Sequence, residues 1–119
     1  YNKRGNARAA LGELRTAVED FNQALKIDSN FVDAYYNRGL TRNQMGDKQG
    51  ALADYDRALQ LNPNLAEAYG SRGLIRNQMG DKQGALADFE KAAQLFQQQG
   101  DLASYQQTQQ YIRQLQPFR

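Results

Sequence analysis

The chain has 119 residues, a formal net charge of +2, and neither cysteine nor histidine. It can therefore form no disulfide and no thiolate metal site, and it lacks both the commonest general base and the commonest metal ligand. Its charges are interleaved along the sequence instead of gathered in a basic stripe, which disfavours nucleic-acid binding. We expect no enzyme activity, no catalytic residue, no metal site and no cofactor.

No segment approaches the roughly 20 apolar residues that cross a membrane as a helix, and no signal-peptide pattern is present. We expect no membrane insertion and favour a cytoplasmic location.

One segment of the sequence is repeated without change, because residues 42–54 recur as residues 76–88, an offset of 34 residues. Similar residues in equivalent columns, such as Gly5, Gly39 and Gly73, extend the period to three copies. A unit of this length cannot bury its apolar face alone, so copies stack and close a continuous core between them. The period predicts a helical-repeat protein whose function belongs to a surface.

The first copy covers residues 1–31 and lacks its first turn, so we expect the chain to be a piece of a longer array or a processed form. Its second half carries a stripe of apolar residues at helical spacing, namely Val18, Phe21, Ala24 and Leu25. This spacing predicts an amphipathic helix. Equivalent stripes occur in the second copy, 32–65, and in the third, 66–99. With an earlier helix in each copy, they predict three helix hairpins.

Glycine followed by aspartate marks the turn inside the second and third copies, at Gly46-Asp47 and Gly80-Asp81. Glycine ends a helix readily in the left-handed conformation, and aspartate caps the start of the next helix. Between copies, Asn30–Asp33 and Asn64–Glu67 have the spacing of capping boxes. These signals predict where each helix begins and ends.

A glycine recurs inside the first helix of every copy, at positions 5, 39 and 73. Glycine in a helix interior costs about 1 kcal/mol relative to alanine. Such a cost in one column indicates close contact with the second helix. We predict that these glycines face small side chains of the second helix: Ala17, Ala51 and Ala85.

After the third copy, Gly100 and Asp101 predict a helix stop and the N-cap of one further helix, 101–116. Its apolar face would consist of Leu102, Tyr105, Ile112 and Leu115. Glutamines cover the other face, and helical arrays need such a cap, apolar inside and polar outside. Glutamine-rich sequence is also typical of low-complexity segments, but the helical spacing favours an ordered capping helix.

Together these columns resemble the tetratricopeptide repeat (TPR), a helix-turn-helix unit of about 34 residues. In the second copy the characteristic family positions hold Tyr35, Gly39, Ala51, Tyr55, Ala58 and Pro63. The resemblance implies an all-α fold, a right-handed α-solenoid of three TPR hairpins plus a C-terminal capping helix, within a single domain of residues 1–116. It also implies a non-catalytic protein-interaction scaffold.

Arginine replaces two usual family residues in every copy, at Arg4, Arg8, Arg38, Arg42, Arg72 and Arg76. Arginines at i, i+4 spacing on equivalent helices could bind phosphate or an acidic peptide. Alternatively, each copy holds an internal ion pair, such as Arg38 with Asp54 and Arg72 with Asp88. Because aspartate recurs in step on the facing helix, the sequence favours the ion pairs.

In the TPR family the first helices line a concave groove that holds an extended peptide or a helix from a partner. Carried over to this chain, the groove positions are Asn2, Asn6, Asp33, Tyr36, Asn37, Leu40, Asn43, Gln44, Glu67, Ser71, Leu74, Asn77 and Gln78. The amides would pair with a ligand's backbone, and Tyr36, Leu40 and Leu74 would anchor it. Packing between neighbouring first helices is an equally good interpretation of Leu40 and Leu74.

One TPR subfamily grips the C-terminal carboxylate of chaperones with a clamp of Lys, Asn, Asn, Lys and Arg. The clamp columns fall here on Asn2, Asn6, Asn37, Glu67 and Ser71. Both clamp asparagines are present, but all three cations are missing and Glu67 would repel a carboxylate. We therefore do not expect this clamp to operate here.

The sequence thus predicts a protein or peptide partner, bound in the groove, whose identity it does not specify. The alternative is self-association. The incomplete first copy would leave an uncapped apolar face that includes Tyr1, Leu11 and Leu14, and this face could stack on another chain.

Overall fold

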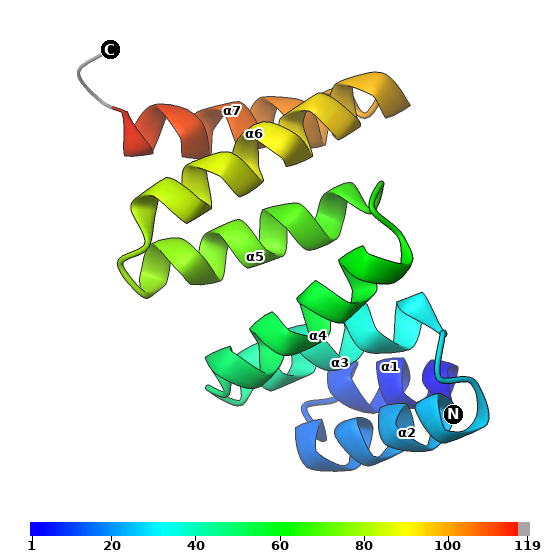
Figure 1. The fold of residues 1–119 in the computed structure, drawn as a ribbon. Coiled ribbons are helices and arrows are strands. Elements are labelled where there is room, and N and C mark those ends of the chain that lie inside the picture. The colour runs from blue at the N-terminus through cyan, green and yellow to red at the C-terminus, as the bar shows by residue number, and fades with distance from the viewer. Residues whose placement is uncertain (117–119) are drawn as a thin grey trace. The chain divides into compact units, whose positions relative to one another are not determined.

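The computed structural model describes residues 1–116 and contains, within that range, seven α-helices and no strand (Figure 1). The helices are α1 (Asn2–Ala10), α2 (Leu14–Ile27), α3 (Val32–Gln44), α4 (Lys48–Leu61), α5 (Ala66–Gln78), α6 (Lys82–Gln99) and α7 (Leu102–Leu115). The all-α fold predicted from the sequence is confirmed. The chain divides into two compact units, one of Tyr1–Pro63 and one that begins at Asn64.

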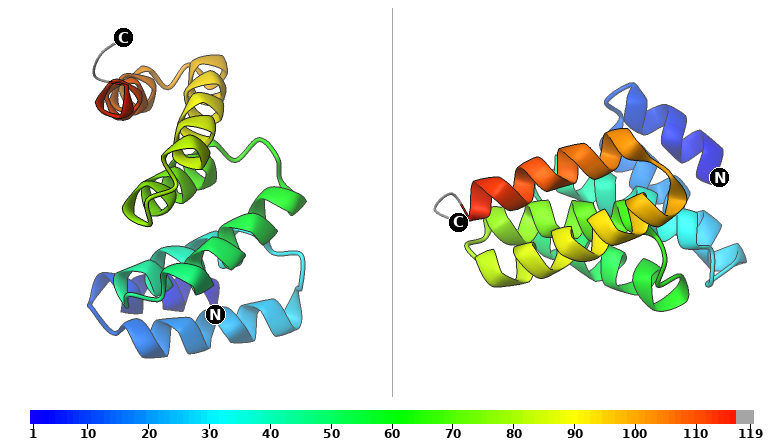
Figure 2. Two further views of the ribbon diagram at one scale, coloured as in Figure 1. Left: turned by 60° about the vertical axis from the view of Figure 1, so that its left-hand side comes forward. Right: turned by 90° about the horizontal axis from the view of Figure 1, so that it is seen from above.

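The first unit consists of two helix hairpins, α1 with α2 and α3 with α4, and α2 packs against α3 (Figure 2). Helix α1 also lies beside α3. Fully buried side chains form the core of this unit: Ala17, Phe21, Ala34, Ala51 and Tyr55. These residues recur at helical spacing, so their burial follows from the apolar stripes of the sequence.

The second unit consists of the hairpin of α5 with α6, and of α7, which packs along α6 (Figures 1 and 2). Its core includes the cluster Ala66, Ala92, Leu95 and Phe96, against which Tyr69 and Tyr105 pack. The rings of Phe89 and Tyr111 stack with centroids 5.2 Å apart, which joins α7 to α6. Helix α7 thus covers the apolar side of α6, as expected of a capping helix.

The predicted turns are confirmed inside the second and third copies. Gly46 and Gly80 have φ values of 88° and 89°, which lie in the left-handed region that favours glycine. Asp47 then caps α4 by accepting a hydrogen bond of 2.9 Å from the backbone N–H of Gly50. Asp81 caps α6 in the same way.

The predicted capping boxes between the copies are wrong. Helices α3 and α5 have Phe31 and Leu65 as N-caps, and neither side chain makes a capping hydrogen bond. Helix α3 begins one residue too late for Asn30 to be its N-cap. The backbone N–H of Asn30 instead donates a 3.0 Å hydrogen bond to the Asp28 carboxylate, which forms a local turn.

The glycines of the first helices do face the second helices, but the nearest side chain in each copy is an aromatic ring and not the predicted alanine. A Cβ atom added to Gly39 would lie 2.7 Å from Cε1 of the Tyr55 ring. In the other copies the same position would meet Phe21 at 2.7 Å from Gly5 and Phe89 at 2.8 Å from Gly73. The glycine column therefore makes room for an aromatic ring instead of matching a small side chain.

The capping helix α7 forms as predicted, after Gly100 with φ 76° and with Asp101 accepting from the Ser104 N–H at 3.2 Å. The predicted apolar face is only partly correct, because Leu102 in the first turn is 63% exposed. Tyr111, which the pattern did not single out, makes the ring contact to α6 instead.

The glycine–ring contact can be tested within helix α5. Gly73→Ala places a methyl group against the Phe89 ring, and we expect the free energy of unfolding to fall by about 1–3 kcal/mol, the usual cost of overpacking a core. Gly70→Ala is the matched control, because a Cβ at Gly70 meets nothing within 4 Å. We expect it to leave stability unchanged or to raise it by up to about 1 kcal/mol. Urea denaturation followed by circular dichroism measures both, and equal effects would contradict the contact.

Candidate peptide-binding site

In the first unit, the predicted site residues of α1 and α3 come together through two asparagines. The side-chain N–H₂ group of Asn37 donates a 3.2 Å hydrogen bond to Oδ1 of Asn2. Both residues are half-buried, and Asn6 is exposed further along α1. Because an amide side chain both donates and accepts, this bond does not use the Asn2 N–H₂ group, the second N–H of Asn37 or the Asn37 Oδ1 atom.

Along α3 the predicted residues follow one helical stripe at i, i+3 and i+4 spacing from Asn37. Leu40 is 36% exposed, and Asp33 and Gln44 are exposed at either end of the helix. Asn43 is engaged from the neighbouring helix, because Lys48 Nζ donates a 3.2 Å hydrogen bond to its Oδ1 atom. The stripe is therefore polar at its ends and apolar at its centre.

Tyr36 belongs as much to the core as to this surface. Its ring lies 5.7 Å from that of Tyr55, centroid to centroid, at an angle of 43°. Tyr36 is half-buried, whereas Tyr55 is fully buried. A variant at Tyr36 would therefore change both stability and surface contacts, which makes Leu40 the better position for probing binding alone.

In the second unit, α5 carries the remaining predicted residues. Leu74 is 38% exposed, Ser71 is half-buried, and three residues are exposed: Glu67, Asn77 and Gln78. Leu40 and Leu74 occupy the same column and have nearly the same exposure. Neither of these leucines is buried.

The arginines form internal ion pairs, as the sequence favoured. Each second helix holds one buried aspartate, and two arginines of the first helix share it. Arg38 donates from Nε and a terminal nitrogen to Asp54 at 3.0 and 2.7 Å, and Arg42 adds a third bond of 3.0 Å. The second pairing of each copy was not foreseen, although i, i+4 spacing brings both arginines to the same side of the helix.

The same arrangement recurs in the other two copies. Arg72 and Arg76 bind Asp88 at 2.8 and 2.9 Å, and Arg4 and Arg8 bind Asp20 at 2.8 and 3.1 Å. The Arg4 guanidinium lowers the pKa of the Asp20 carboxyl from its ordinary value of 3.8 through their hydrogen bond, which outweighs the opposing effect of burial. These arginines bind aspartates within the hairpins. Their positions are therefore explained by ion pairs inside each copy, and not by binding of phosphate or an acidic peptide.

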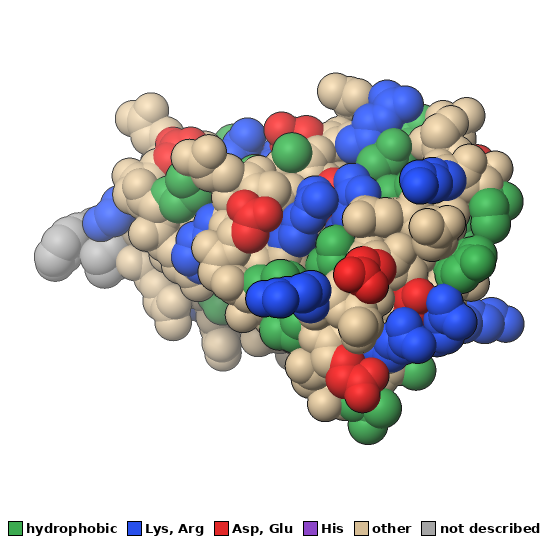
Figure 3. Space-filling model, turned by 90° about the horizontal axis from the view of Figure 1, so that it is seen from below, with side chains coloured by type: hydrophobic (Ala, Val, Ile, Leu, Met, Phe, Trp, Pro, Cys, Tyr) green, Lys and Arg blue, Asp and Glu red, His purple; other side chains and the backbone are tan. Residues whose placement is uncertain are grey.

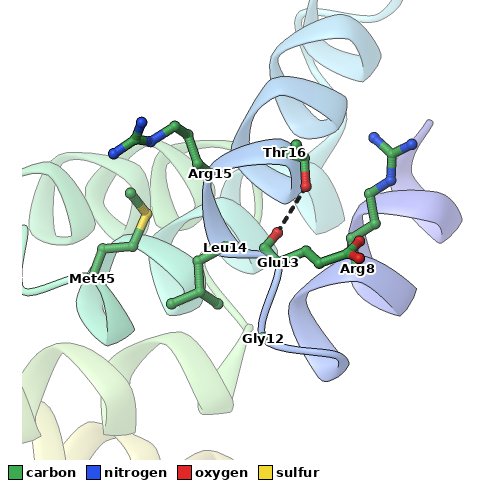
Figure 4. Close-up of a pocket in the computed structure, with 7 residues that line it drawn as sticks. All are labelled: Arg8, Gly12, Glu13, Leu14, Arg15, Thr16 and Met45. Carbon is green, nitrogen blue, oxygen red and sulfur yellow. Dashed lines mark hydrogen bonds between the residues drawn. The ribbon is translucent and has the colours of Figure 1, made fainter.

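Several hollows on residues 1–116 lie away from the predicted site residues. One of about 680 Å³ lies at the turn between α1 and α2, and is lined by Leu14, Arg15 and Met45 among others (Figure 4). Another of about 510 Å³ lies on α7 around Tyr105 and Arg113. A small one of about 110 Å³ lies around Gly100. Arg15 and Met45 were not predicted from the sequence as site residues.

On the face drawn in Figure 3, Lys and Arg side chains alternate with Asp and Glu side chains. Across residues 1–116, His, Cys, Asp and Glu side chains form no group of three that could hold a metal ion. Within the same range, none of the helices is both long and apolar enough to cross a membrane.

Hairpins of similar length, repeated with glycine turns and equivalent ion pairs, define an α-helical repeat protein. Models of known families identify the repeat. Tetratricopeptide repeat models match residues 51–115 and 32–65, and a TPR repeat model matches residues 5–46. The chain belongs to the tetratricopeptide repeat family, whose fold is generally a non-catalytic protein-interaction module.

Solved structures with the same fold include MamA, which is 27% identical with a TM-score of 0.78 over 82% of this chain. The chain spans 57% of the length of that MamA chain. PcrH in complex with the chaperone binding region of PopD is 19% identical, with a TM-score of 0.91 over 97% of this chain and 87% of that chain. The first TPR of Spaghetti (RPAP3), bound to an HSP90 peptide, is also 19% identical, with a TM-score of 0.87 over 98% and 87%. No curated protein sequence matches the chain significantly.

The shared aspartate can be tested in α6. Asp88→Asn removes the charge that two arginines share, and we expect the free energy of unfolding to fall by about 2 kcal/mol, because a buried ion pair that loses one partner leaves the other uncompensated. Glu90→Gln is the control, since Glu90 is exposed on the same helix. We expect that change to stay within about 0.5 kcal/mol. Urea denaturation compares the two variants, and equal stabilities would refute a role for the carboxylate.

Asp20 allows a test of pH dependence with a defined sign. Because folding lowers the pKa of its carboxyl below 3.8, ionised Asp20 stabilises the fold above that pH, and the contribution disappears as the pH falls through the folded-state pKa. We expect the Asp20→Asn variant to have a lower melting temperature than the wild type at neutral pH. Its melting temperature should then fall less than that of the wild type on acidification. As the pH falls from about 7 to about 2, the melting temperatures of the wild type and of the Asp20→Asn variant should converge. Parallel curves would show that Asp20 is not the titrating group.

Proposed function

We propose that this chain is a non-catalytic scaffold that binds an extended peptide or a partner segment on the first-helix face. The first-helix face is present in each unit as a separate surface: the predicted residues of α1 and α3 form it in the first unit, and those of α5 form it in the second. The observation that carries the proposal is the Asn2–Asn37 amide pair, 3.2 Å apart, three residues from the part-exposed Leu40. Amides that flank an apolar side chain suit a peptide backbone with an apolar anchor.

Two of the structurally similar proteins support this mode of binding. The PcrH structure contains the chaperone binding region of PopD, and the RPAP3 structure contains an HSP90 peptide. Both are TPR-fold proteins that carry a partner segment. The fold of this chain offers the same kind of scaffold, and its own side chains set the ligand chemistry.

The ligand chemistry differs from that of a carboxylate clamp. The clamp columns hold Asn2, Glu67 and Ser71 where the clamp has cations, and Glu67 is exposed. A terminal carboxylate would meet a like charge there. We infer a ligand that is recognised through its backbone and an apolar side chain instead of a terminal carboxylate.

Truncation of the two exposed leucines tests the face. We expect Leu40→Ala combined with Leu74→Ala to weaken capture of a partner from native lysate by about ten-fold or more, because apolar anchors carry much of the binding energy. The control is Gln23→Ala with Glu90→Ala, two exposed positions on second helices. Quantitative mass spectrometry after affinity capture compares the variants. Undiminished capture by the leucine variant, at an unchanged melting temperature, would rule out the first-helix face.

Self-association is a second candidate, favoured by the exposure of two apolar residues of the first copy. Leu11 is 76% exposed and Tyr1 is 52% exposed. Stacking through this copy would bury both residues in a second chain. Light scattering over a range of concentrations measures this directly, and a persistent monomer would rule it out.

A further inference from the structure

The turn between α1 and α2 carries an open hollow of about 680 Å³, called here the turn hollow. Leu14 and Met45 line its apolar part, and Met45 is 46% exposed. Arg15 lines the same side, as Figure 4 shows. All of these residues belong to the first unit, and none belongs to the first-helix face.

The residues of the turn hollow differ from those of the other two copies. Leu14 and Arg15 stand in the columns of Lys48 and Gln49, and the third copy has the same Lys-Gln pair. Helices α4 and α6 form hairpins with that pair, so the hairpin does not require leucine and arginine. The apolar and cationic character of the turn hollow is therefore particular to the first copy and is not explained by the architecture.

The charges around the turn hollow divide it into two sides. Arg8 is engaged by Asp20 at 3.1 Å, and in Figure 4 the Glu13 side chain points toward Arg8 and away from Leu14 and Met45. Arg15 forms no ion pair with any residue in the described range 1–116. The side with Leu14 and Met45 is thus apolar and carries the Arg15 guanidinium, while Glu13, which also lines the hollow, points away from it.

We propose that the turn hollow binds a partner segment in which an apolar side chain stands next to a carboxylate. The apolar side chain packs between Leu14 and Met45, where it covers surface that is otherwise exposed to water. The carboxylate accepts charge-assisted hydrogen bonds from the Arg15 guanidinium. This second interaction surface would allow the chain to hold one partner on the first-helix face and another at the turn.

A defined peptide probe tests the proposal with the intact chain. The probe is the octapeptide Gly-Ser-Asp-Leu-Asp-Ser-Gly-Ser, and its controls replace the leucine by serine or both aspartates by asparagine. In a titration followed by NMR, we expect saturable shifts of the Leu14 and Arg15 amides and of the Met45 methyl group. Each control peptide should bind about ten-fold more weakly or not measurably, since each lacks one of the two contacts.

The other copies supply the matched variant. Leu14→Lys with Arg15→Gln installs the residues of the second and third copies, so the hairpin should remain folded while the saturable shifts disappear. Met45→Ala should weaken binding about five-fold. Met79 occupies the equivalent column of the third copy and is 48% exposed. Met79→Ala should leave binding of the octapeptide unchanged. Leu40→Ala with Leu74→Ala should also leave binding unchanged, which separates this surface from the first-helix face.

Three results would overturn the proposal. One is the absence of saturable shifts in the wild type, and another is the same shifts in the Lys-Gln variant. The third is a wild-type dimer that becomes monomeric in the Lys-Gln variant while the octapeptide fails to bind, which would assign the turn hollow to a second copy of this chain. Analytical ultracentrifugation of both proteins supplies that comparison.

Discussion

In each copy, a glycine of the first helix lies so close to an aromatic ring of the second helix that a Cβ atom would collide with it. The residue before the glycine is an arginine, and the residue before the ring is the buried aspartate that binds it. In the second copy these are Arg38 with Gly39 and Asp54 with Tyr55. The close contact and the ion pair are thus adjacent and set the rotation of the first helix. That rotation decides which side chains, such as Asn37 and Leu40, face outward.

Much of this framework could be predicted from the sequence, because residues that recur every 34 positions occupy equivalent places in each hairpin. Columns of glycine, aspartate and aromatic residues indicated hairpins, turns and buried ion pairs. The columns could not show which atoms fill the space between two helices. Ala51 was therefore expected as the neighbour of Gly39, whereas the Tyr55 ring lies closest to it. Capping depends on the residue at which a helix begins, and a shift of one residue was enough to make the Asn30–Asp33 box wrong. Leu102 was misplaced because helical spacing alone does not fix where a packed face starts.

The candidate site was less predictable than the fold. Its residues came from the family resemblance, and the structure adds contacts between segments far apart in the sequence, such as Asn2 with Asn37 and Tyr36 with Tyr55. No spacing rule reports such contacts. The turn hollow did leave a signal, because Leu14 breaks a column that otherwise contains lysine. Departures from a repeat are therefore as informative as the repeat, provided that each column is compared across all copies.

The identity of residues 42–54 and 76–88 also bears on how the chain folds. Asp88 and Phe89 would accept Arg38 and Gly39 about as well as Asp54 and Tyr55 do, so the interface by itself does not distinguish α4 from α6 as the partner of α3. The incorrect pairing closes a loop roughly three times as long, which disfavours it by only about 1 kcal/mol. The turn at Gly46 and Asp47 supplies the rest of the discrimination, because it returns α4 onto α3 before α6 is available. A longer or more flexible turn would therefore promote exchange of helices between copies, and between chains, without weakening any native contact.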